Sequence, residues 1–156
     1  ETLESHFALV TKQTAPVLGP QQLVSCMANP DKCGGSGGCQ GATQPLAFTY
    51  TETTGLSLES SYPYTGQTGT CDTSKIAPVV TNTGVVQLPQ NNYTALIGAV
   101  ATVGPVSISV AAGSFGWQLY FGGVYTGSCD YDMDHAVQLV GYGEDSGNLY
   151  WLVRNS

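Results

Sequence analysis

Residues 133–143 read MDHAVQLVGYG and residues 150–156 read YWLVRNS. Both runs are rich in apolar and aromatic residues, and the turn-forming tripeptide DSG at 145–147 lies between them. A strand, a tight turn and a second strand are therefore predicted, with His135 opening the first strand. Upstream, VSISV at 106–110 alternates apolar and polar residues, which is the period of a strand. The predicted strands are 106–110, 135–143 and 149–154.

Helical patterns precede these strands. Leu3, Phe7 and Val10 recur at helical spacing, which predicts an amphipathic helix at the start of the chain. Pro20 suits the first turn of a helix, where its missing N–H costs no hydrogen bond, and Gly55 is a stop signal. The predicted helices are 1–12, 20–26, 44–54 and a fourth that follows a cap at Asn92 and ends before the Gly-Pro pair at 104–105.

The order of these elements indicates an α+β protein with two segregated halves, because the helices come first and most of the strands afterwards. We expect the boundary near residues 87–89, which gives a helical domain at 1–87 and a β-rich domain at 88–156. A cleft between two such halves is a usual place for a functional site.

The charge balance excludes several classes of partner. Eleven acidic residues against four basic ones give a formal net charge of −7 at pH 7. Nucleic-acid binding needs clustered Lys and Arg to neutralise phosphates, and the chain has no such cluster. An anionic membrane surface would repel the chain for the same reason, and no apolar run is long enough to span a bilayer. We therefore expect no nucleic-acid partner and no membrane association.

The cysteines indicate the compartment. There are five of them, none in a C-x-x-C pair, and only two histidines accompany them. This pattern disfavours a structural zinc site, and we expect neither a metal nor a cofactor. Scattered cysteines in a loop-rich chain indicate disulfides and hence an oxidising compartment. Because the number is odd, at least one thiol is free or has a partner outside the chain.

Single residues carry little functional information by themselves. His135 can be read as a histidine satisfied by hydrogen bonds at the end of a sheet as well as a catalytic group, and Asn155 could equally occupy a turn. The glycine-rich run at 34–38 has no preceding strand and no following Lys-Ser/Thr, which excludes a phosphate loop. The tripeptide NYT at 92–94 is both a glycosylation sequon and a candidate helix cap. His6 lies on a helix and is assigned a structural role.

Seven blocks of sequence, taken in order, change this interpretation. They are PQQLVSC at 20–26, GCQGA at 38–42, SYPY at 61–64, GPVS at 104–107, GGVY at 122–125, MDHAV with VGYG at 133–143, and YWLVRNS at 150–156. Together they resemble the papain and cathepsin L family of cysteine peptidases from one end of the chain to the other. The resemblance implies a papain-like two-domain fold. In it a helical half is followed by an antiparallel β-barrel-like half, with the active-site cleft between them.

The same resemblance implies a cysteine endopeptidase. In this family a cysteine thiolate attacks the peptide carbonyl, and an imidazolium partner keeps the thiol ionised and then protonates the leaving amine. His135 matches that histidine, and Asn155 matches the residue whose side-chain amide orients the ring. The family also bonds the cysteine of its Leu-Val-x-Cys helix to the one after Tyr-Pro-Tyr, which here pairs Cys26 with Cys71.

Substrate contacts, partners and compartment follow from the resemblance as well. The positions that match substrate-contacting residues of the family are Gly41, Ala42, Thr43, Gln44, Ser109, Met133, Asp134 and Ala136. The implied partners are protein or peptide substrates and propeptide or cystatin-like inhibitors. The implied protein is a monomer, is made as a zymogen and acts in a lysosomal or vacuolar lumen or outside the cell.

The chain also departs from the family pattern. The nucleophile segment C-G-[SA]-C-[WY] is absent, and the first residues resemble later turns of the helix that the nucleophile opens. We therefore expect the nucleophile about seven residues before Glu1, and we expect this piece to be inactive by itself. The tripeptide QGA at 40–42 replaces Asn-Gly-Gly, and its added methyl group restricts φ. Cys39 and Cys129 match cysteines whose partners lie outside the chain, and Cys33 matches none.

Two alternatives remain at the level of sequence. The first is a papain-fold protein whose nucleophile is replaced, either silicatein-like or a non-catalytic binding protein. The second is a disulfide-linked binding domain unrelated to peptidases, which the seven ordered blocks disfavour. The residue at the nucleophile position, Cys, Ser or Gly, discriminates among them.

Overall fold

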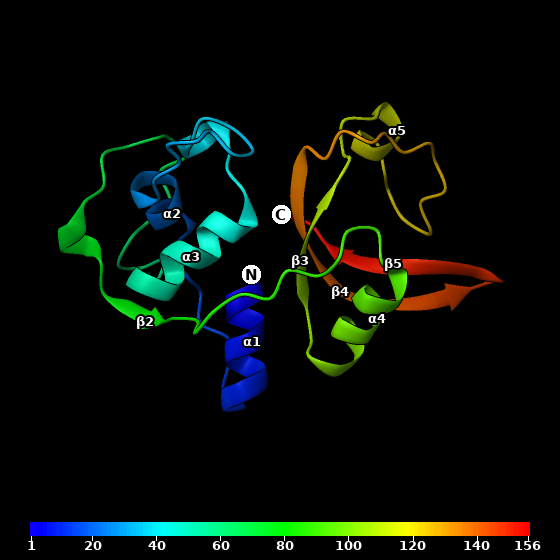
Figure 1. Ribbon diagram of the computed structural model, residues 1–156, viewed down its shortest axis with the longest axis horizontal. Coiled ribbons are helices and arrows are strands. Elements are labelled where there is room, and N and C mark those ends of the chain that lie inside the picture. The colour runs from blue at the N-terminus through cyan, green and yellow to red at the C-terminus, as the bar shows by residue number, and fades with distance from the viewer. The chain divides into compact units, whose positions relative to one another are not determined.

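The computed structural model describes residues 1–156. The chain forms two compact units, Glu1–Gln87 and Leu88–Ser156, and each is described by itself (Figure 1). The first is mainly helical and the second contains the larger sheet, so the predicted α+β fold is confirmed. None of the helices combines the length and the apolar character that crossing a membrane requires.

The helices of the first unit begin and end where local chemistry favours it. Pro20 occupies the first turn of its helix, and Gly55 ends the third with φ 71°. Lys12 ends the first helix in the left-handed region, where its N–H donates to the Ala8 carbonyl at 2.9 Å. The α-helices are α1 (Thr2–Thr11), α2 (Pro20–Cys26) and α3 (Gln44–Thr54). All three predicted helices are confirmed.

Four short elements of the first unit were not predicted. They are the 3-10 helices η1 (Gly38–Gln40) and η2 (Thr73–Lys75) and the strands β1 (Leu56–Ser57) and β2 (Pro78–Val80), which pair antiparallel. Each has only two or three residues, which is too short for a repeating pattern to be recognised.

The apolar core of the first unit gathers around this small sheet. Its buried residues are Leu18, Leu56 and Val80, and Leu3, Phe7, Leu23 and Tyr50 pack against them. Leu3 and Phe7 are four residues apart and therefore lie on one face of α1. Two residues of the predicted apolar stripe thus join α1 to the core, whereas the third, Val10, is 80% exposed.

Two adjacent glutamines on α2 are buried and satisfied by hydrogen bonds. Gln22 is fully buried; its Nε2 donates to the Tyr50 hydroxyl at 3.1 Å and to the Gly55 carbonyl at 3.0 Å. Its Oε1 accepts from the Ser57 N–H at 2.9 Å. Gln21 is likewise buried, and its Nε2 donates to the Ser25 hydroxyl at 2.9 Å. Gln22 thus joins α2 to the end of α3 and to β1 through polar groups that an apolar pattern cannot reveal.

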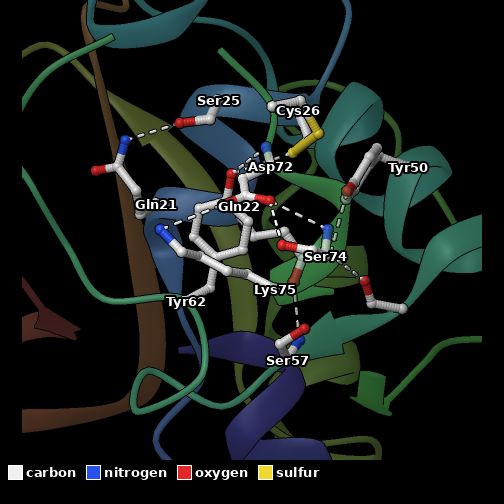
Figure 2. The surroundings of a disulfide bond; sticks show 12 residues. Gln21, Gln22, Ser25, Cys26, Tyr50, Ser57, Tyr62, Asp72, Ser74 and Lys75 are labelled. Atoms are coloured by element: carbon white, nitrogen blue, oxygen red, sulfur yellow. Dashed lines mark hydrogen bonds and ion pairs between the residues drawn. A yellow bond between two sulfur atoms is a disulfide. The ribbon is translucent and has the colours of Figure 1, made fainter. Parts of the chain in front are cut away.

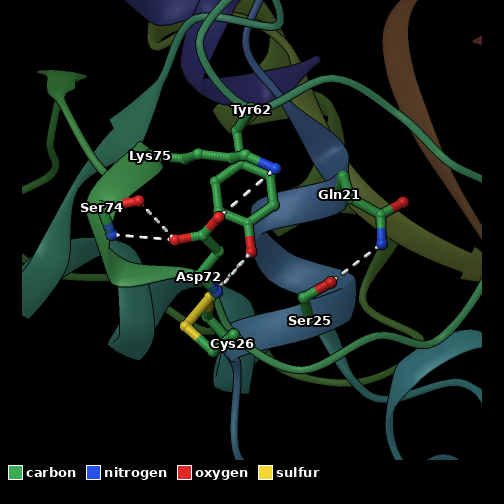
Figure 3. Close-up of polar contacts among 8 residues, drawn as sticks. Gln21, Ser25, Cys26, Tyr62, Asp72, Ser74 and Lys75 are labelled. Atoms are coloured by element: carbon green, nitrogen blue, oxygen red, sulfur yellow. Dashed lines mark hydrogen bonds and ion pairs between the residues drawn. A yellow bond between two sulfur atoms is a disulfide. The ribbon is translucent and has the colours of Figure 1, made fainter.

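The predicted disulfide Cys26–Cys71 is confirmed (Figure 2). Beside it lies the buried ring of Tyr62, whose hydroxyl accepts from the Asp72 N–H at 3.0 Å and lies 3.5 Å from Cys26 Sγ (Figure 3). Lys75 Nζ lies 5.9 Å from the centre of the Tyr62 ring and 3.4 Å from the Asp72 carboxylate. Tyr62 belongs to the loop that the Cys26–Cys71 disulfide closes, and its ring lies beside the disulfide.

The second unit contains a three-stranded antiparallel sheet in the order β3-β4-β5, with each outer strand paired on one side. The strands are β3 (Val106–Val110), β4 (His135–Asp145) and β5 (Asn148–Arg154). Ser146 and Gly147, both with positive φ, form the β4–β5 turn. The three predicted strands are confirmed, β4 being two residues longer at its end and β5 one residue longer at its start.

Two helices accompany this sheet. They are α4 (Tyr93–Thr102), which was predicted, and α5 (Phe115–Gln118), which was not. Asn92 caps α4, because its Oδ1 accepts from the Ala95 N–H at 2.9 Å. The helix lies against β4, and at its first turn the Tyr93 ring contacts Trp151 of β5 at 5.3 Å between ring centres.

Candidate active site

Antiparallel pairing brings the start of β4 beside the end of β5, where two candidate catalytic residues lie. Gln138 pairs with Arg154, the last residue of β5. His135 begins β4 three residues earlier, and Asn155 follows β5 directly. His135 Nε2 lies 2.7 Å from Asn155 Oδ1. Residues twenty positions apart in the sequence thus meet through one hairpin.

This contact assigns the proton on the imidazole ring. A carboxamide oxygen can only accept a hydrogen bond, so Nε2 of His135 must be the donor to Asn155 Oδ1. In the neutral ring Nδ1 is then free of a proton and can act as a base. The ring of His135 is half-buried, and Asn155 is exposed. The hydrogen bond to Asn155 therefore holds the ring through Nε2 and leaves Nδ1 free to act as a base.

Three further candidates of the second unit lie around the start of β4. Ser109 of β3 pairs directly with Ala136 of β4, and both are exposed. Met133, two residues before His135, is 54% exposed. Small residues on the paired strands and an apolar thioether in the preceding loop leave open surface beside the histidine.

The Asp134 side chain is hydrogen-bonded to the segment that follows β3. Its Oδ1 accepts from the Ala112 N–H at 2.7 Å, and its own N–H donates to the Val110 carbonyl at 3.2 Å. Gln118 Nε2 donates to the Ala112 carbonyl at 2.9 Å. The segment after β3 is thus held from both sides next to His135. Gln118 could not be predicted from the sequence, because α5 is only four residues long.

The four candidates of the first unit form one continuous run. Gly41 ends η1 with φ 92°, and Thr43 and Gln44 form the N-terminus of α3. A Cβ on Gly41 would lie 2.8 Å from the Gly34 carbonyl oxygen, so this position requires glycine. Ala42 has no positive φ. The methyl group of Ala42 therefore causes no strain of the kind that a positive φ would impose. Gly41 is the position of this run that requires glycine.

The glycine-rich loop before this run is held by one side chain. Asn29 Nδ2 donates to the Cys33 carbonyl at 3.0 Å and to the Gly35 carbonyl at 2.9 Å. Its Oδ1 accepts from the Cys33 N–H at 2.9 Å.

Cys33, Cys39 and Cys129 are exposed free thiols. No three His, Cys, Asp or Glu side chains gather closely enough to hold a metal ion.

Comparison with known proteins places these features in a family. The pattern of the papain family cysteine protease matches residues 1–156. Over 142 residues the chain is 42% identical to the senescence-specific cysteine protease SAG12 of Arabidopsis thaliana, covering 89% of this chain and 39% of that protein. It is 43% identical over 141 residues to the KDEL-tailed cysteine endopeptidase CEP2 of the same organism, covering 89% and 37%. The chain thus spans about two fifths of the length of these curated relatives.

Solved structures agree with the fold. The proform of the Amb a 11 cysteine protease, a major ragweed pollen allergen, matches with a TM-score of 0.88 and 38% identity, over 98% of this chain and 46% of that one. Bromelain from Ananas comosus, solved with an inhibitor, matches with a TM-score of 0.87 and 32% identity, over 99% and 68%. With the fold, the disulfide and the ordered sequence blocks in agreement, the chain belongs to the papain family of cysteine proteases.

Proposed function

We propose that the whole protein is a cysteine endopeptidase in which His135 is the general acid and base and Asn155 positions its ring. The observation that carries this proposal is the 2.7 Å contact between His135 Nε2 and Asn155 Oδ1. It leaves Nδ1 available for proton transfer while the other nitrogen is fixed. The relatives named above, which are called cysteine proteases or endopeptidases, support the same activity.

The proposed chemistry is acyl transfer in two halves. A cysteine outside residues 1–156 gives its proton to His135 Nδ1, and the thiolate attacks the peptide carbonyl. The C–N bond breaks as Nδ1 protonates the leaving amine, which leaves a thioester. Water, deprotonated by the same nitrogen, attacks the thioester and releases the acid and the thiol. Asn155 takes no proton in this cycle.

The first experiment identifies the nucleophile from the coding sequence and tests His135 as the base. The coding sequence upstream of residue 1 should contain a cysteine in a C-G-[SA]-C-[WY] context. His135→Ala in the full-length enzyme should then abolish peptide hydrolysis, whereas His6→Ala on α1 serves as the matched control and should retain it. Ser or Gly at the nucleophile position would overturn the cysteine mechanism and favour a papain-fold protein with another role.

Substrate contacts are proposed for residues of both units. In the first unit they are Gly41, Ala42, Thr43 and Gln44, and in the second they are Ser109, Met133, Asp134 and Ala136. Met133 is apolar and adaptable, and Ser109 and Ala136 are small and exposed. The Asp134 carboxylate already accepts from the Ala112 N–H. None of the residues matched to the pocket for the second residue before the cut (Thr43, Gln44, Ser109, Met133 and Ala136) is acidic, so a basic substrate side chain would lose water there without gaining an ionic partner.

We therefore expect Leu, Val or Phe to be preferred over Arg or Lys at the second residue before the cut. An apolar pocket discriminates by about 1–3 kcal/mol, so the preference should be graded. A fluorogenic peptide series that varies only this residue, measured on the activated full-length enzyme, tests it. A higher kcat/KM for Arg than for Leu would contradict these assignments.

The compartment and the partners of the whole protein are part of the proposal. One relative is named KDEL-tailed, and the solved relatives include a proform and an inhibitor complex. With the disulfide, these names support a vacuolar, lysosomal or secreted protein that is made as a zymogen. The proposal further includes a monomer that is blocked by propeptide or cystatin-like inhibitors.

A further inference from the structure

The tripeptide Asn92-Tyr93-Thr94 is the only N-x-[ST] sequence within residues 1–156. As a sequence it has two readings, a helix cap and an acceptor for an N-linked glycan. The structure shows that the cap is real, since Asn92 Oδ1 accepts from the Ala95 N–H at 2.9 Å. A glycan is compatible with this cap only if the nitrogen of the same carboxamide, Nδ2, is available.

The cap and the glycan use different atoms of Asn92. Capping occupies Oδ1, whereas a glycan is attached to Nδ2, which forms no hydrogen bond here. Because Oδ1 is turned toward the first turn of α4, Nδ2 on the same carbon is directed away from the helix. A glycosylated asparagine keeps its carboxamide oxygen, so the cap would persist.

The surroundings of Asn92 are open to solvent. Residues 89–94 are all exposed, and Tyr93 is 55% exposed although its ring also contacts Trp151. A bulky, hydrated sugar needs a surface position of this kind. The Cys26–Cys71 disulfide supports passage through the oxidising compartment in which such glycans are added.

We propose that Asn92 carries an N-linked glycan in the full-length protein. The co-reactant is an oligosaccharide linked to a lipid through a pyrophosphate, as supplied in the secretory pathway. The bond from Asn92 Nδ2 to sugar C1 forms as the bond from C1 to the phosphate oxygen breaks. The lipid pyrophosphate leaves, and one Nδ2 proton passes to a base of the transferase. No oxidation or reduction takes place.

The experiment expresses the full-length protein through the secretory pathway of a eukaryotic host and analyses the peptide that contains residue 92. Amidase deglycosylation in heavy-oxygen water should leave a labelled aspartate at position 92. Thr94→Ala, which keeps the cap, should lose the label, and Thr94→Ser, which keeps the sequon, should retain it. The matched neighbour control is Asn91→Gly, which lies outside the sequon and suits the φ of 54° found at position 91.

A further variant separates the two roles of the residue. Asn92→Asp preserves an oxygen that can cap α4 but removes the acceptor nitrogen. The Asn92→Asp variant should lose the glycan, and its melting temperature should equal that of Thr94→Ala. An unmodified residue 92 in the wild-type secreted protein would overturn the proposal, and so would a glycan at residue 92 that persists in Thr94→Ala. Neither result depends on peptidase activity, so failure of this proposal is distinguishable from failure of the proposed function.

Discussion

At the scale of single residues, the hydrogen bond between His135 and Asn155 is the feature on which the proposed function depends most. The sequence predicted both residues, because their blocks resemble those of a known family. The sequence alone left each of them with a structural reading, and only the hairpin brings their side chains to 2.7 Å. The engagement of Asp134 with the Ala112 N–H was not predictable, since it depends on the path of the loop after β3.

The positioning role of Asn155 leads to a first prediction. Asn155→Ala removes one charge-assisted hydrogen bond, worth about 1.5–3 kcal/mol, so kcat/KM of the full-length enzyme should fall about 10- to 150-fold. The loss should lie in kcat with KM little changed, because Asn155 acts through His135. Asn148→Ala, at the exposed start of β5, is the matched control in steady-state kinetics. An unchanged kcat in a folded Asn155→Ala enzyme would refute the role.

A second residue-scale prediction concerns Asp72. The Ser74 hydroxyl donates to its Oδ1 at 2.6 Å and, with Lys75 nearby, holds the pKa of Asp72 below its usual value. Since the folded pKa is the lower one, the carboxylate stabilises the fold above the unfolded pKa of about 3.9. This contribution is lost as pH falls through the folded pKa. Ser74→Ala should raise the pKa of Asp72 in an NMR titration, whereas Ser114→Ala on the second unit should leave it unchanged.

At the scale of helices and strands, boundaries were predictable where a residue type forces them. Pro20 and Gly55 mark helix ends because each restricts or permits a particular backbone conformation. The small β1–β2 sheet was not predictable, because two strands of two and three residues carry no period. The bonds of Gln22 were hidden for another reason: a polar residue on an expected helix is ordinarily assigned to the surface.

The joining role of Gln22 gives the third prediction. Gln22→Met keeps the length of the side chain but leaves the buried Ser57 N–H and the Gly55 carbonyl without partners. Each unsatisfied group costs about 1–3 kcal/mol, so the free energy of unfolding should fall by about 2–6 kcal/mol. Denaturant unfolding of the full-length protein measures it. The exposed Gln67→Met is the control and should stay within about 0.5 kcal/mol of wild type; equal losses in both variants would contradict the assignment.

At the scale of the whole molecule, the α+β character and the family were predictable because the order of the sequence blocks extends along the entire chain. The short helix α5 was not, since it depends on how the chain between β3 and β4 turns over residues 111–134. The disulfide was predicted from the family and not from spacing, because five cysteines allow many pairings.

The fourth prediction concerns this disulfide. Cys26 and Cys71 are 45 residues apart, and closing a loop of that length restricts the unfolded chain enough to stabilise the fold by about 3–4 kcal/mol. The double variant Cys26→Ala/Cys71→Ala should lose about that amount in thermal or denaturant unfolding of the full-length protein. Cys33→Ala, which removes an exposed free thiol, is the control and should change little.

The same bond has a consequence for proteolytic cleavage of this chain. The loop at 30–34 is exposed, and exposed loop tips are where chains are preferentially cut. A cut there falls between Cys26 and Cys71, so the severed ends stay tethered to one molecule until a reductant arrives. A cut in the exposed stretch at 83–87 falls outside the tether, and no covalent bond within residues 1–156 would then hold the two units together. A nick at 30–34 therefore leaves residues 1–87 covalently linked through the disulfide, whereas a nick at 83–87 leaves its two products without a covalent link within residues 1–156.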